Sequence, residues 1–227
     1  MSVFRTETVH CPACETPVEF ELVVSVNADR RPDLRQAILD GTFQRQTCPS
    51  CGTGFRVEPS FTYMNLGRDQ YIGVWPIDMR AEWQANAERT RATFEAALGS
   101  GATPEARKLG AKLEPRVVFG WPALVEKILA RQAGIDDRTL ELAKVAVLRH
   151  GAETYVPGKR ELRLVGVGET NLMLAWVNTA DTTIAGTVSV PRKLIGEIEA
   201  EPDAWKALRD DVADGLVVDF QREMLSA

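Results

Sequence analysis

The sequence predicts an α+β protein in three parts: a β-rich N-terminal module with an inserted helix, a helical middle, and a C-terminal antiparallel three-stranded sheet with helices. Three observations support this fold class. Two Cys-x-x-Cys pairs flank segments rich in β-branched residues, helix-capping residues follow in the middle, and alternating apolar residues return in the last third. At 227 residues the chain is long enough for two domains. We therefore divide it into residues 1–150 and residues 151–227.

The N-terminal module is predicted from the residues around the cysteine pairs. Residues 18–26 alternate in polarity and are rich in valine, so they predict a strand. Pro32 opens a short helix, and Gly41 is well placed to end it. Further strands are predicted over residues 43–47, 53–62 and 65–74.

The middle of the chain carries helix signals. Asp78 is an N-cap for a helix that runs to about Leu98, and the glycines and proline of residues 99–115 predict an exposed loop. The next helix begins at Pro122 and ends at Gly134. Asp136 then caps the helix that follows, with Ile135 placed to pack against its first turns.

The last third returns to strands. Short polar connections separate three apolar segments, and short connections favour antiparallel pairing. The three strands are predicted over residues 161–167, 172–177 and 184–190. Two helices with proline near their starts and a closing strand are predicted over residues 191–200, 202–213 and 216–220.

The cysteines predict a metal site. Cys11, Cys14, Cys48 and Cys51 are all the cysteines of the chain, and they form two Cys-Pro-x-Cys pairs. Two thiolates three positions apart on a tight turn can bind one ion at about 2.3 Å, so the duplicated spacing predicts Zn²⁺ bound by all four sulfurs in a zinc-ribbon-like module. Such a shell has no open position for water or substrate, so we expect the zinc to be structural. Gly52 fits a turn that needs a positive φ.

Two alternatives concern the same cysteines. Cys-Pro-x-Cys also resembles the active-site turn of glutaredoxins, where a helix N-terminus lowers the pKa of a thiol. Here the predicted strand over residues 18–26 follows the first pair instead of a helix, and redox chemistry does not explain two pairs. His10 directly precedes Cys11 and could replace a thiolate, although the first pair would then lose its regular turn.

Composition bears on partners and compartment. The net charge is −5, and residues 1–80 hold 8 Arg and no Lys against 10 acids. This slightly acidic module argues against nucleic acid as the partner, because such binding draws on Lys and Arg at phosphates. No apolar run is long enough for a membrane span, and the first residues lack a secretory segment. We expect a cytoplasmic protein, in which paired cysteines hold metal more often than disulfides.

The chain resembles the CpXC domain proteins of bacteria and archaea. The resemblance rests on Cys11-Pro12-Ala13-Cys14 and Cys48-Pro49-Ser50-Cys51-Gly52, the helix between them, the strand pair ending near Val74-Trp75-Pro76, and the run Ile135 to Leu142. It covers roughly residues 9–150. The resemblance implies a metal-binding domain and names no biochemical role.

These observations favour a non-enzymatic zinc-binding protein that acts as a protein-interaction or adaptor module, with another protein as its partner. With two histidines and no His-Glu motif, a catalytic zinc site is poorly supported, and no catalytic residue is predicted. Asp136 and Asp137 would suit magnesium, but helix capping explains both. The alternatives are a thiol-disulfide redox protein that uses the Cys-Pro-x-Cys pairs and a nucleic-acid-associated zinc ribbon.

Overall fold

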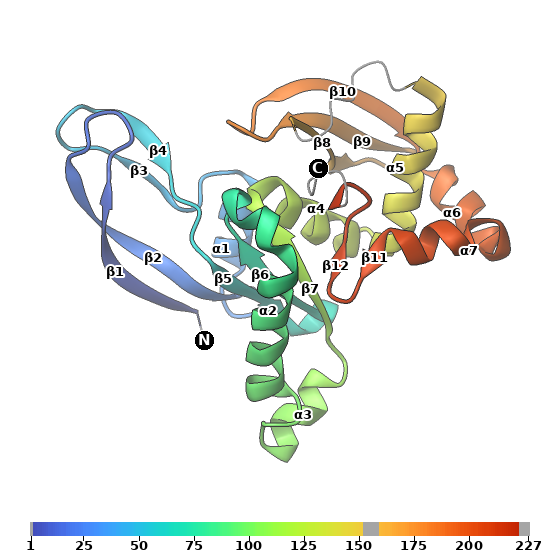
Figure 1. Cartoon of the computed structure of the whole chain (residues 1–227), viewed down its shortest axis with the longest axis horizontal. Helices are drawn as coiled ribbons and strands as arrows, with labels where there is room; N and C mark the ends of the chain where they lie inside the picture. The colour runs from blue at the N-terminus through green and yellow to red at the C-terminus, as the bar shows by residue number, and fades with distance from the viewer. Residues whose placement is uncertain (1, 152–158, 223–227) are drawn as a thin grey trace. The chain divides into compact units, whose positions relative to one another are not determined.

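The computed structural model describes residues 2–151 and 159–222 (Figure 1). Its contacts divide the chain into two compact units. The first unit comprises residues 1–77 and 88–121, and the second comprises residues 78–87 and 122–227. Within the described part, no helix has the length and apolar character to cross a membrane. The α+β class is confirmed, as is the C-terminal three-stranded antiparallel sheet.

The first unit is built on a five-stranded sheet in the order β1-β2-β5-β6-β7, with a separate two-stranded sheet, β3-β4. The β1–β2 and β5–β6 pairs are antiparallel, whereas β2–β5 and β6–β7 are parallel. The strands are β1 (Val3–His10), β2 (Pro17–Asn27), β3 (Arg45–Thr47), β4 (Gly54–Arg56), β5 (Phe61–Asn65), β6 (Gln70–Trp75) and β7 (Glu114–Phe119). The helices that begin in this stretch of chain are α1 (Pro32–Leu39), η1 (Leu66–Arg68), η2 (Ile77–Glu82), α2 (Trp83–Leu98) and α3 (Pro104–Gly110).

The inserted helix α1 follows its sequence signals. Pro32 occupies the first turn, where a missing N–H group costs nothing. Leu34 and Ile38 lie buried one turn apart, and Gly41 ends the helix with a φ of 69°. The helix therefore returns the chain to the start of β3.

Parts of residues 1–121 differ from the sequence predictions. The strand expected over residues 65–74 contains η1 before β6 begins at Gln70, and the helix expected from Asp78 consists of η2 followed by α2. β1 was not predicted, because its exposed residues lack a clear alternation of polarity. The strand expected over residues 53–62 is divided into β4 and β5, and Pro59 lies in the gap between them. Residues 99–115, expected as a loop, contain α3, which Thr103 caps by accepting a hydrogen bond from the N–H of Ala106.

Close packing of α2 on β6 requires a glycine. A Cβ atom at Gly73 would come within 3.0 Å of the side chain of Thr90, so a larger residue would push the helix away. The Thr90 hydroxyl accepts a hydrogen bond of 3.0 Å from the Trp75 indole N–H. Tyr71 and Phe94 add an edge-to-face contact with ring centroids 5.0 Å apart.

The second unit contains the C-terminal sheet in the order β10-β9-β8. The predicted strands are confirmed to within one residue at each end of β8 (Arg160–Val167), β9 (Asn171–Asn178) and β10 (Ile184–Pro191). The helices are α4 (Gly120–Gln132), α5 (Asp137–Gly151), α6 (Lys193–Ala200) and α7 (Pro202–Asp211), and the short strands β11 (Ala213–Asp214) and β12 (Val217–Val218) pair near the C-terminus. The predicted division at residue 150 stays a prediction, although α5 and most of α4 belong to the same unit as this sheet.

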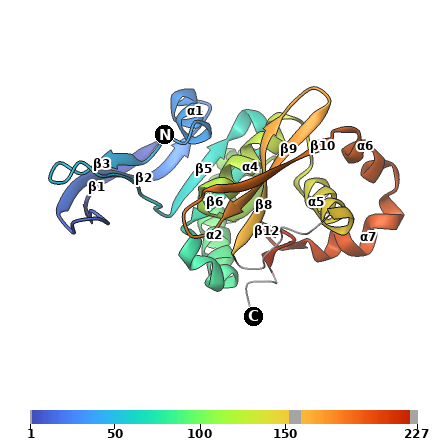
Figure 2. The ribbon, with the colours of Figure 1, turned by 90° about the horizontal axis from the view of Figure 1, so that it is seen from above.

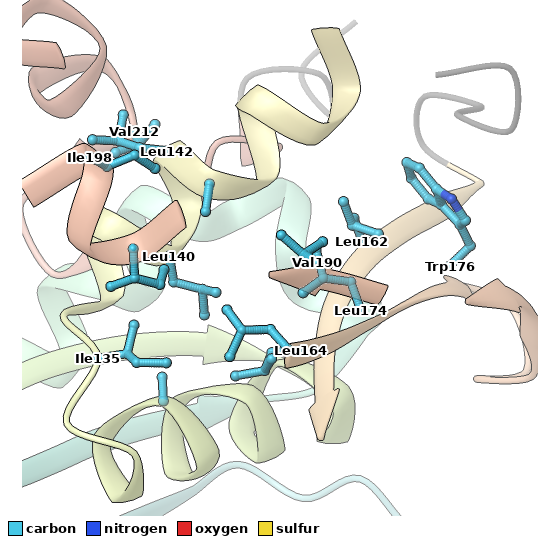
Figure 3. Packing of buried hydrophobic residues seen from close by; sticks show 14 residues of the cluster. Ile135, Leu140, Leu142, Leu162, Leu164, Leu174, Trp176, Val190, Ile198 and Val212 are labelled. Carbon is cyan, nitrogen blue, oxygen red and sulfur yellow. The ribbon is translucent and has the colours of Figure 1, made fainter. Parts of the chain in front are cut away.

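One apolar core joins the sheet to the helices of the second unit. Figure 3 shows Leu164, Leu174 and Val190 of the sheet in the same packed region as Leu140 and Ile135. Figure 2 gives a second view of these elements. The predicted capping is confirmed, because Asp136 accepts the N–H of Thr139 at 2.9 Å and Ile135 lies in the core with Leu140.

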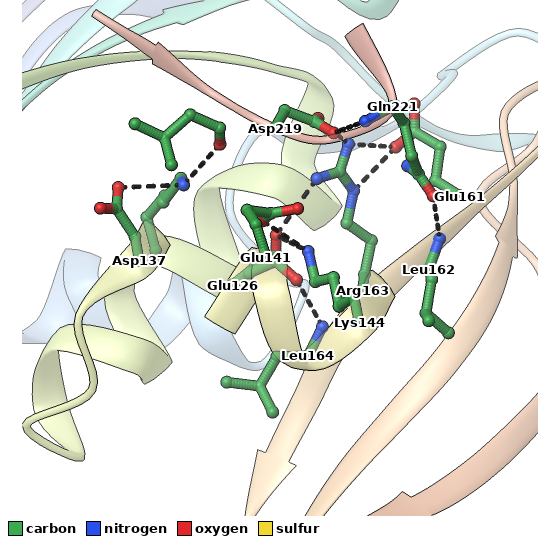
Figure 4. Close-up of polar contacts among 12 residues, drawn as sticks. Glu126, Asp137, Glu141, Lys144, Glu161, Leu162, Arg163, Leu164, Asp219 and Gln221 are labelled. Atoms are coloured by element: carbon green, nitrogen blue, oxygen red, sulfur yellow. Dashed lines mark hydrogen bonds and ion pairs between the residues drawn. The ribbon is translucent and has the colours of Figure 1, made fainter. Parts of the chain in front are cut away.

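A buried ionic network lies in the same unit (Figure 4). Glu126, which is fully buried, accepts hydrogen bonds from Lys144 at 2.7 Å, from Arg163 at 3.1 Å and from the N–H of Leu164 at 2.6 Å. Lys144 also binds Glu141 at 2.8 Å. The cations of the network are Arg80, Lys127, Lys144 and Arg163, and its carboxylates are Glu126, Asp137, Glu141, Glu161 and Asp219.

The network also holds the C-terminal segment. Lys127 donates to the carbonyl oxygen of Val218 at 2.8 Å, and Glu141 accepts the N–H of Phe220 at 3.2 Å. Arg163 forms an ion pair with Asp219 at 2.9 Å. Buried charges are tolerated only when they are paired and hydrogen-bonded, so these contacts make the segment after β11 part of the fold.

The carboxyl groups of the network differ in pKa. Although burial disfavours its charge, Glu126 has a lowered pKa because Lys144 and Arg163 lie against it. Burial dominates at Glu141 and raises its pKa to about 7 despite the attraction of Lys144. Glu141 therefore titrates near neutral pH.

We predict that Glu141→Gln flattens the pH dependence of stability between about pH 5 and pH 8. The folded-state pKa of about 7 exceeds the ordinary value, so Glu141 stabilises the wild-type fold most below about pH 4 and this contribution is lost as the pH rises through 7. The free energy of unfolding should be measured by urea denaturation across this pH range. As the pH rises, it should decrease more steeply for the wild type than for the variant. Glu199→Gln, an exposed carboxyl in the same unit, is the control. If the unfolding free energy of Glu141→Gln changed with pH as steeply as that of the wild type, the raised pKa of Glu141 would be contradicted.

Candidate metal centre

The two Cys-Pro-x-Cys turns have the same backbone structure. In the first, the N–H of Glu15 donates to the carbonyl oxygen of Cys11 at 2.9 Å, and the N–H of Cys11 donates to the carbonyl oxygen of Thr16 at 3.0 Å. The second repeats both bonds, each at 2.9 Å, between Gly52 and Cys48 and between Cys48 and Thr53. Each turn is therefore a closed loop that presents two sulfurs to one side. We call these turns knuckle 1 (residues 11–16) and knuckle 2 (residues 48–53).

Two hairpins carry the knuckles. Knuckle 1 joins β1 to β2, and knuckle 2 joins β3 to β4. Figure 1 and Figure 2 show these blue and cyan hairpins side by side within the first unit. The helix α1 between them returns the chain so that cysteines 34 to 40 positions apart meet. We call the two hairpins together the ribbon.

The four sulfurs form one cluster. Their Sγ atoms all lie within 4.8 Å of one another. Sγ of Cys11 lies 3.7 Å from that of Cys51, and Sγ of Cys14 lies 3.6 Å from that of Cys48. A tetrahedral ion with sulfur ligands at about 2.3 Å requires sulfurs about 3.8 Å apart, whereas a disulfide requires about 2.05 Å. The cysteines are free thiols whose spacing fits a shared metal ion.

The two sulfurs of each pair have different surroundings. Cys11 and Cys48 are buried and pack with Val18, Val9 and Phe55. Cys14 and Cys51 are exposed. Each exposed sulfur lies beside the hydroxyl of the threonine two positions later. Sγ of Cys14 is 3.2 Å from Oγ1 of Thr16, and Sγ of Cys51 is 3.3 Å from Oγ1 of Thr53.

These surroundings set the pKa values of the metal-free thiols. The hydroxyl and N–H groups of Thr16 stabilise a thiolate and lower the pKa of Cys14 to about 6, and Thr53 lowers the pKa of Cys51 in the same way. The N–H of Ala13 favours the thiolate of Cys11, but burial and the neighbouring thiols outweigh it and raise the pKa to about 11. The exposed thiols thus lose their protons more readily than the buried Cys11, and a bound cation would favour the thiolate form of its ligands.

The sequence prediction missed Thr16 and Thr53. The signal was present, because a threonine stands two residues after the second cysteine of each pair. Threonine is common in β-rich segments, so the sequence alone does not single out these two. The structure does, because each hydroxyl lies beside the exposed sulfur of its knuckle. Groups that bond to ligand sulfurs orient and tune a metal site.

The other residues considered from the sequence lie elsewhere. His10 is exposed at the end of β1, and the group of described residues placed to share a metal ion consists of the four cysteines. Asp136 is occupied as a helix cap, and Asp137 binds Lys127 at 3.0 Å. Neither aspartate is part of a metal-binding group in the described chain.

We predict opposite effects of reciprocal substitutions at the equivalent knuckle positions. Gly52 has a φ of 74° and Glu15 a φ of 58°, a region that disfavours residues with a Cβ atom. Gly52→Ala should destabilise by about 1 kcal/mol, since no atom lies within 4 Å of the new Cβ and only the backbone is strained. Glu15→Gly should be neutral or stabilise by up to about 1 kcal/mol. Denaturant titrations of wild type and both variants at the same metal content would measure the two changes in the free energy of unfolding. If both variants were destabilised equally, the positive φ at these positions would not be the cause.

Comparison with known proteins gives one family. The family model described as CpXC protein matches residues 9–144, which include both knuckles and reach into α5. No curated protein and no solved structure matches the chain. The match spans more than half of the sequence and contains the duplicated cysteine motif on which the resemblance rests. The chain belongs to the CpXC family.

Proposed function

We propose that the four cysteines bind one structural Zn²⁺ and that the protein is a non-enzymatic interaction or adaptor module. The observation that carries the proposal is the closed set of four sulfurs from two equivalent knuckles. Zinc favours four thiolates in tetrahedral geometry. With Cys11, Cys14, Cys48 and Cys51 as ligands, the shell has no open position for a substrate.

The surface of the knuckles suits contact with another protein. The tip residues Pro12, Ala13, Pro49 and Ser50 are exposed and uncharged. A metal would hold these backbone turns rigid, and rigid small surfaces lose little conformational entropy on binding. We therefore place the partner contact at the two knuckle tips.

The redox alternative has one observation in its favour, the lowered pKa and exposure of Cys14. Two features weaken it. Sulfur contacts of 3.7 and 3.6 Å join cysteines of different motifs, Cys11 with Cys51 and Cys14 with Cys48, so each sulfur of one pair also has a neighbour in the other pair. The chain after Cys14 enters strand β2, so no helix N-terminus stabilises the thiolate as it does in the thioredoxin-like proteins.

Our third prediction concerns the ion. Protein purified without added metal should contain about one zinc per chain by elemental analysis, and its thiols should resist alkylation until a chelator is added. Cys14→Ser and Cys51→Ser should each lower zinc retention. The surface variant Ser50→Ala, which removes no sulfur, is the matched control. Recovery of folded, metal-free protein with four reactive thiols would exclude structural zinc, and reversible disulfides in its place would favour the redox alternative.

Our fourth prediction concerns the partner. A photo-crosslinking residue at Ser50 should capture a protein from the native cell, and capture should decrease when zinc is removed. The same residue at Lys108, an exposed position on α3, should not capture the same protein. Capture of nucleic acid at Ser50 would instead support the nucleic-acid-associated zinc ribbon. Equal capture from both positions would contradict a contact at the knuckle tips.

A further inference from the structure

The four sulfurs of the cluster divide by their access to solvent. Cys14 and Cys51 are exposed, whereas Cys11 and Cys48 are each only 1% exposed. In both knuckles the exposed cysteine is the second of its motif. Oxidants dissolved in water react with the thiolates that they can reach, so oxidation of this site begins at Cys14 or Cys51.

The residues around the exposed sulfurs do not shield them from a small reagent. The tip residues between the cysteines are exposed and uncharged: Pro12, Ala13, Pro49 and Ser50. Gly52 places no side chain beside Cys51, and no atom lies within 4 Å of the position of its missing Cβ. Glu15 is the one charged residue of the two knuckles, and it does not repel an uncharged reagent. A hydroperoxide is both small and uncharged, so it is the class of oxidant that fits these surroundings.

Each exposed sulfur lies beside a buried sulfur of the other knuckle. Sγ of Cys14 is 3.6 Å from Sγ of Cys48, and Sγ of Cys51 is 3.7 Å from Sγ of Cys11. A disulfide bond of about 2.05 Å would require the two sulfurs of a contact to approach by roughly 1.6 Å, a movement shared by two side chains. Each site of oxidation therefore has a second thiol within short reach.

Contacts at the base of the ribbon keep these neighbours together without the cysteines. Gln44, at the start of the second hairpin, accepts the N–H of Val23 at 3.2 Å and donates to the carbonyl oxygen of Glu21 at 3.1 Å. Both partners lie on β2 of the first hairpin. The two hairpins thus remain side by side while a metal leaves, and the cysteine of the opposite knuckle remains available to an oxidised sulfur.

From these observations we propose that Cys14 and Cys51 are the sites at which a hydroperoxide oxidises this protein, and that oxidation replaces the metal with two disulfides, Cys14–Cys48 and Cys11–Cys51. Both bonds join one hairpin to the other, so the ribbon stays closed while its zinc is released. This inference rests on the structural zinc of the proposed function and adds a means of regulating that site.

The chemistry needs no group beyond the peroxide. The thiolate of Cys14 attacks one peroxide oxygen, the O–O bond breaks, and hydroxide leaves, which gives a sulfenic acid. The thiolate of Cys48 then attacks the sulfur of Cys14, so that the S–S bond forms and the S–O bond breaks with loss of a second hydroxide. Cys51 and Cys11 repeat these steps with another peroxide. The thiolates lose their charge as they are oxidised, and the disulfides no longer hold the cation.

The first test follows the zinc and the disulfides of the wild-type full chain. Zinc content is measured first, hydrogen peroxide is then added in steps, and a chromogenic chelator records the zinc released. About two molecules of peroxide should be consumed for each zinc. Digestion with trypsin without reductant should then yield residues 6–30 joined to residues 46–56, because these peptides hold the two motifs. Separate peptides, each lacking two hydrogens, would show disulfides within the motifs and would overturn the proposal.

The second test locates the first oxidation. At limiting peroxide, a reagent that traps sulfenic acids, such as dimedone, should label Cys14 and Cys51. Label found mainly on Cys11 and Cys48 would contradict the attack at the exposed sulfurs.

Two reciprocal variants test the pairing. In Cys48→Ala, the disulfide Cys11–Cys51 should form and Cys14 should be left as the trapped sulfenic acid. In Cys11→Ala, Cys14–Cys48 should form and Cys51 should be left. Pairing within each motif would exchange these results, since Cys51 would remain in the first variant and Cys14 in the second. The two variants lose one buried sulfur each and therefore serve as controls for each other.

The outcomes separate this inference from the proposed function. A purified chain that holds no zinc before oxidation would contradict the proposed function and with it the release of metal. A zinc-loaded chain that keeps its metal in excess peroxide, or that joins its cysteines in another pattern, would overturn this inference and leave the structural zinc intact.

Discussion

The tip of the ribbon contains few apolar side chains to hold its two hairpins together, so in our proposal a metal bound by the sulfur cluster would carry that task. Its buried cluster consists of Cys11, Val18 and Cys48, with Val9 and Phe55 packed against it. β3 and β4 have three residues each, and isolated two-stranded hairpins are marginally stable in water. With zinc bound as we propose, four metal–sulfur bonds would replace a missing core, since structural zinc contributes folding energy directly. In this proposal the small apolar core of the ribbon is the reason that its fold would need the metal.

The base of the ribbon is held by ordinary packing. Gln44 joins the start of β3 to β2, because its side chain accepts the N–H of Val23 at 3.2 Å and donates to the carbonyl oxygen of Glu21 at 3.1 Å. Trp121 packs edge-on against Phe43, and its indole face lies 4.0 Å from the guanidinium of Arg56. Burial and the nearby charge of Arg45 lower the pKa of Arg56 to about 10, yet at neutral pH it stays a cation over the ring. The cysteine cluster therefore lies at the end of hairpins whose base is packed within the first unit.

The sequence was sufficient to predict an element where its local signals agree with the fold. The strands of the C-terminal sheet, the cap at Asp136 and the positive φ of Gly52 follow from alternation, capping and turn chemistry. The sequence did not predict β1, because its mostly exposed residues show no clear alternation of polar and apolar types. It did not predict α3, because the glycines and proline around this helix are typical of loops. The cysteines could be predicted as one group because their spacing is chemically specific. The buried network could not, because charged residues at helix positions normally face solvent, and only the tertiary fold shows that Glu126, Glu141 and Lys144 lie inside.

The second unit shows a different balance between stability and specificity. Its core is apolar on one side of α5, yet the last described segment is held by Lys127, Glu141 and Arg163 rather than by apolar contacts alone. Burying these charges costs desolvation energy, and well-packed apolar residues in their place could be as stable. What the charges add is a defined set of donors and acceptors, which allows one backbone register for residues 217–221.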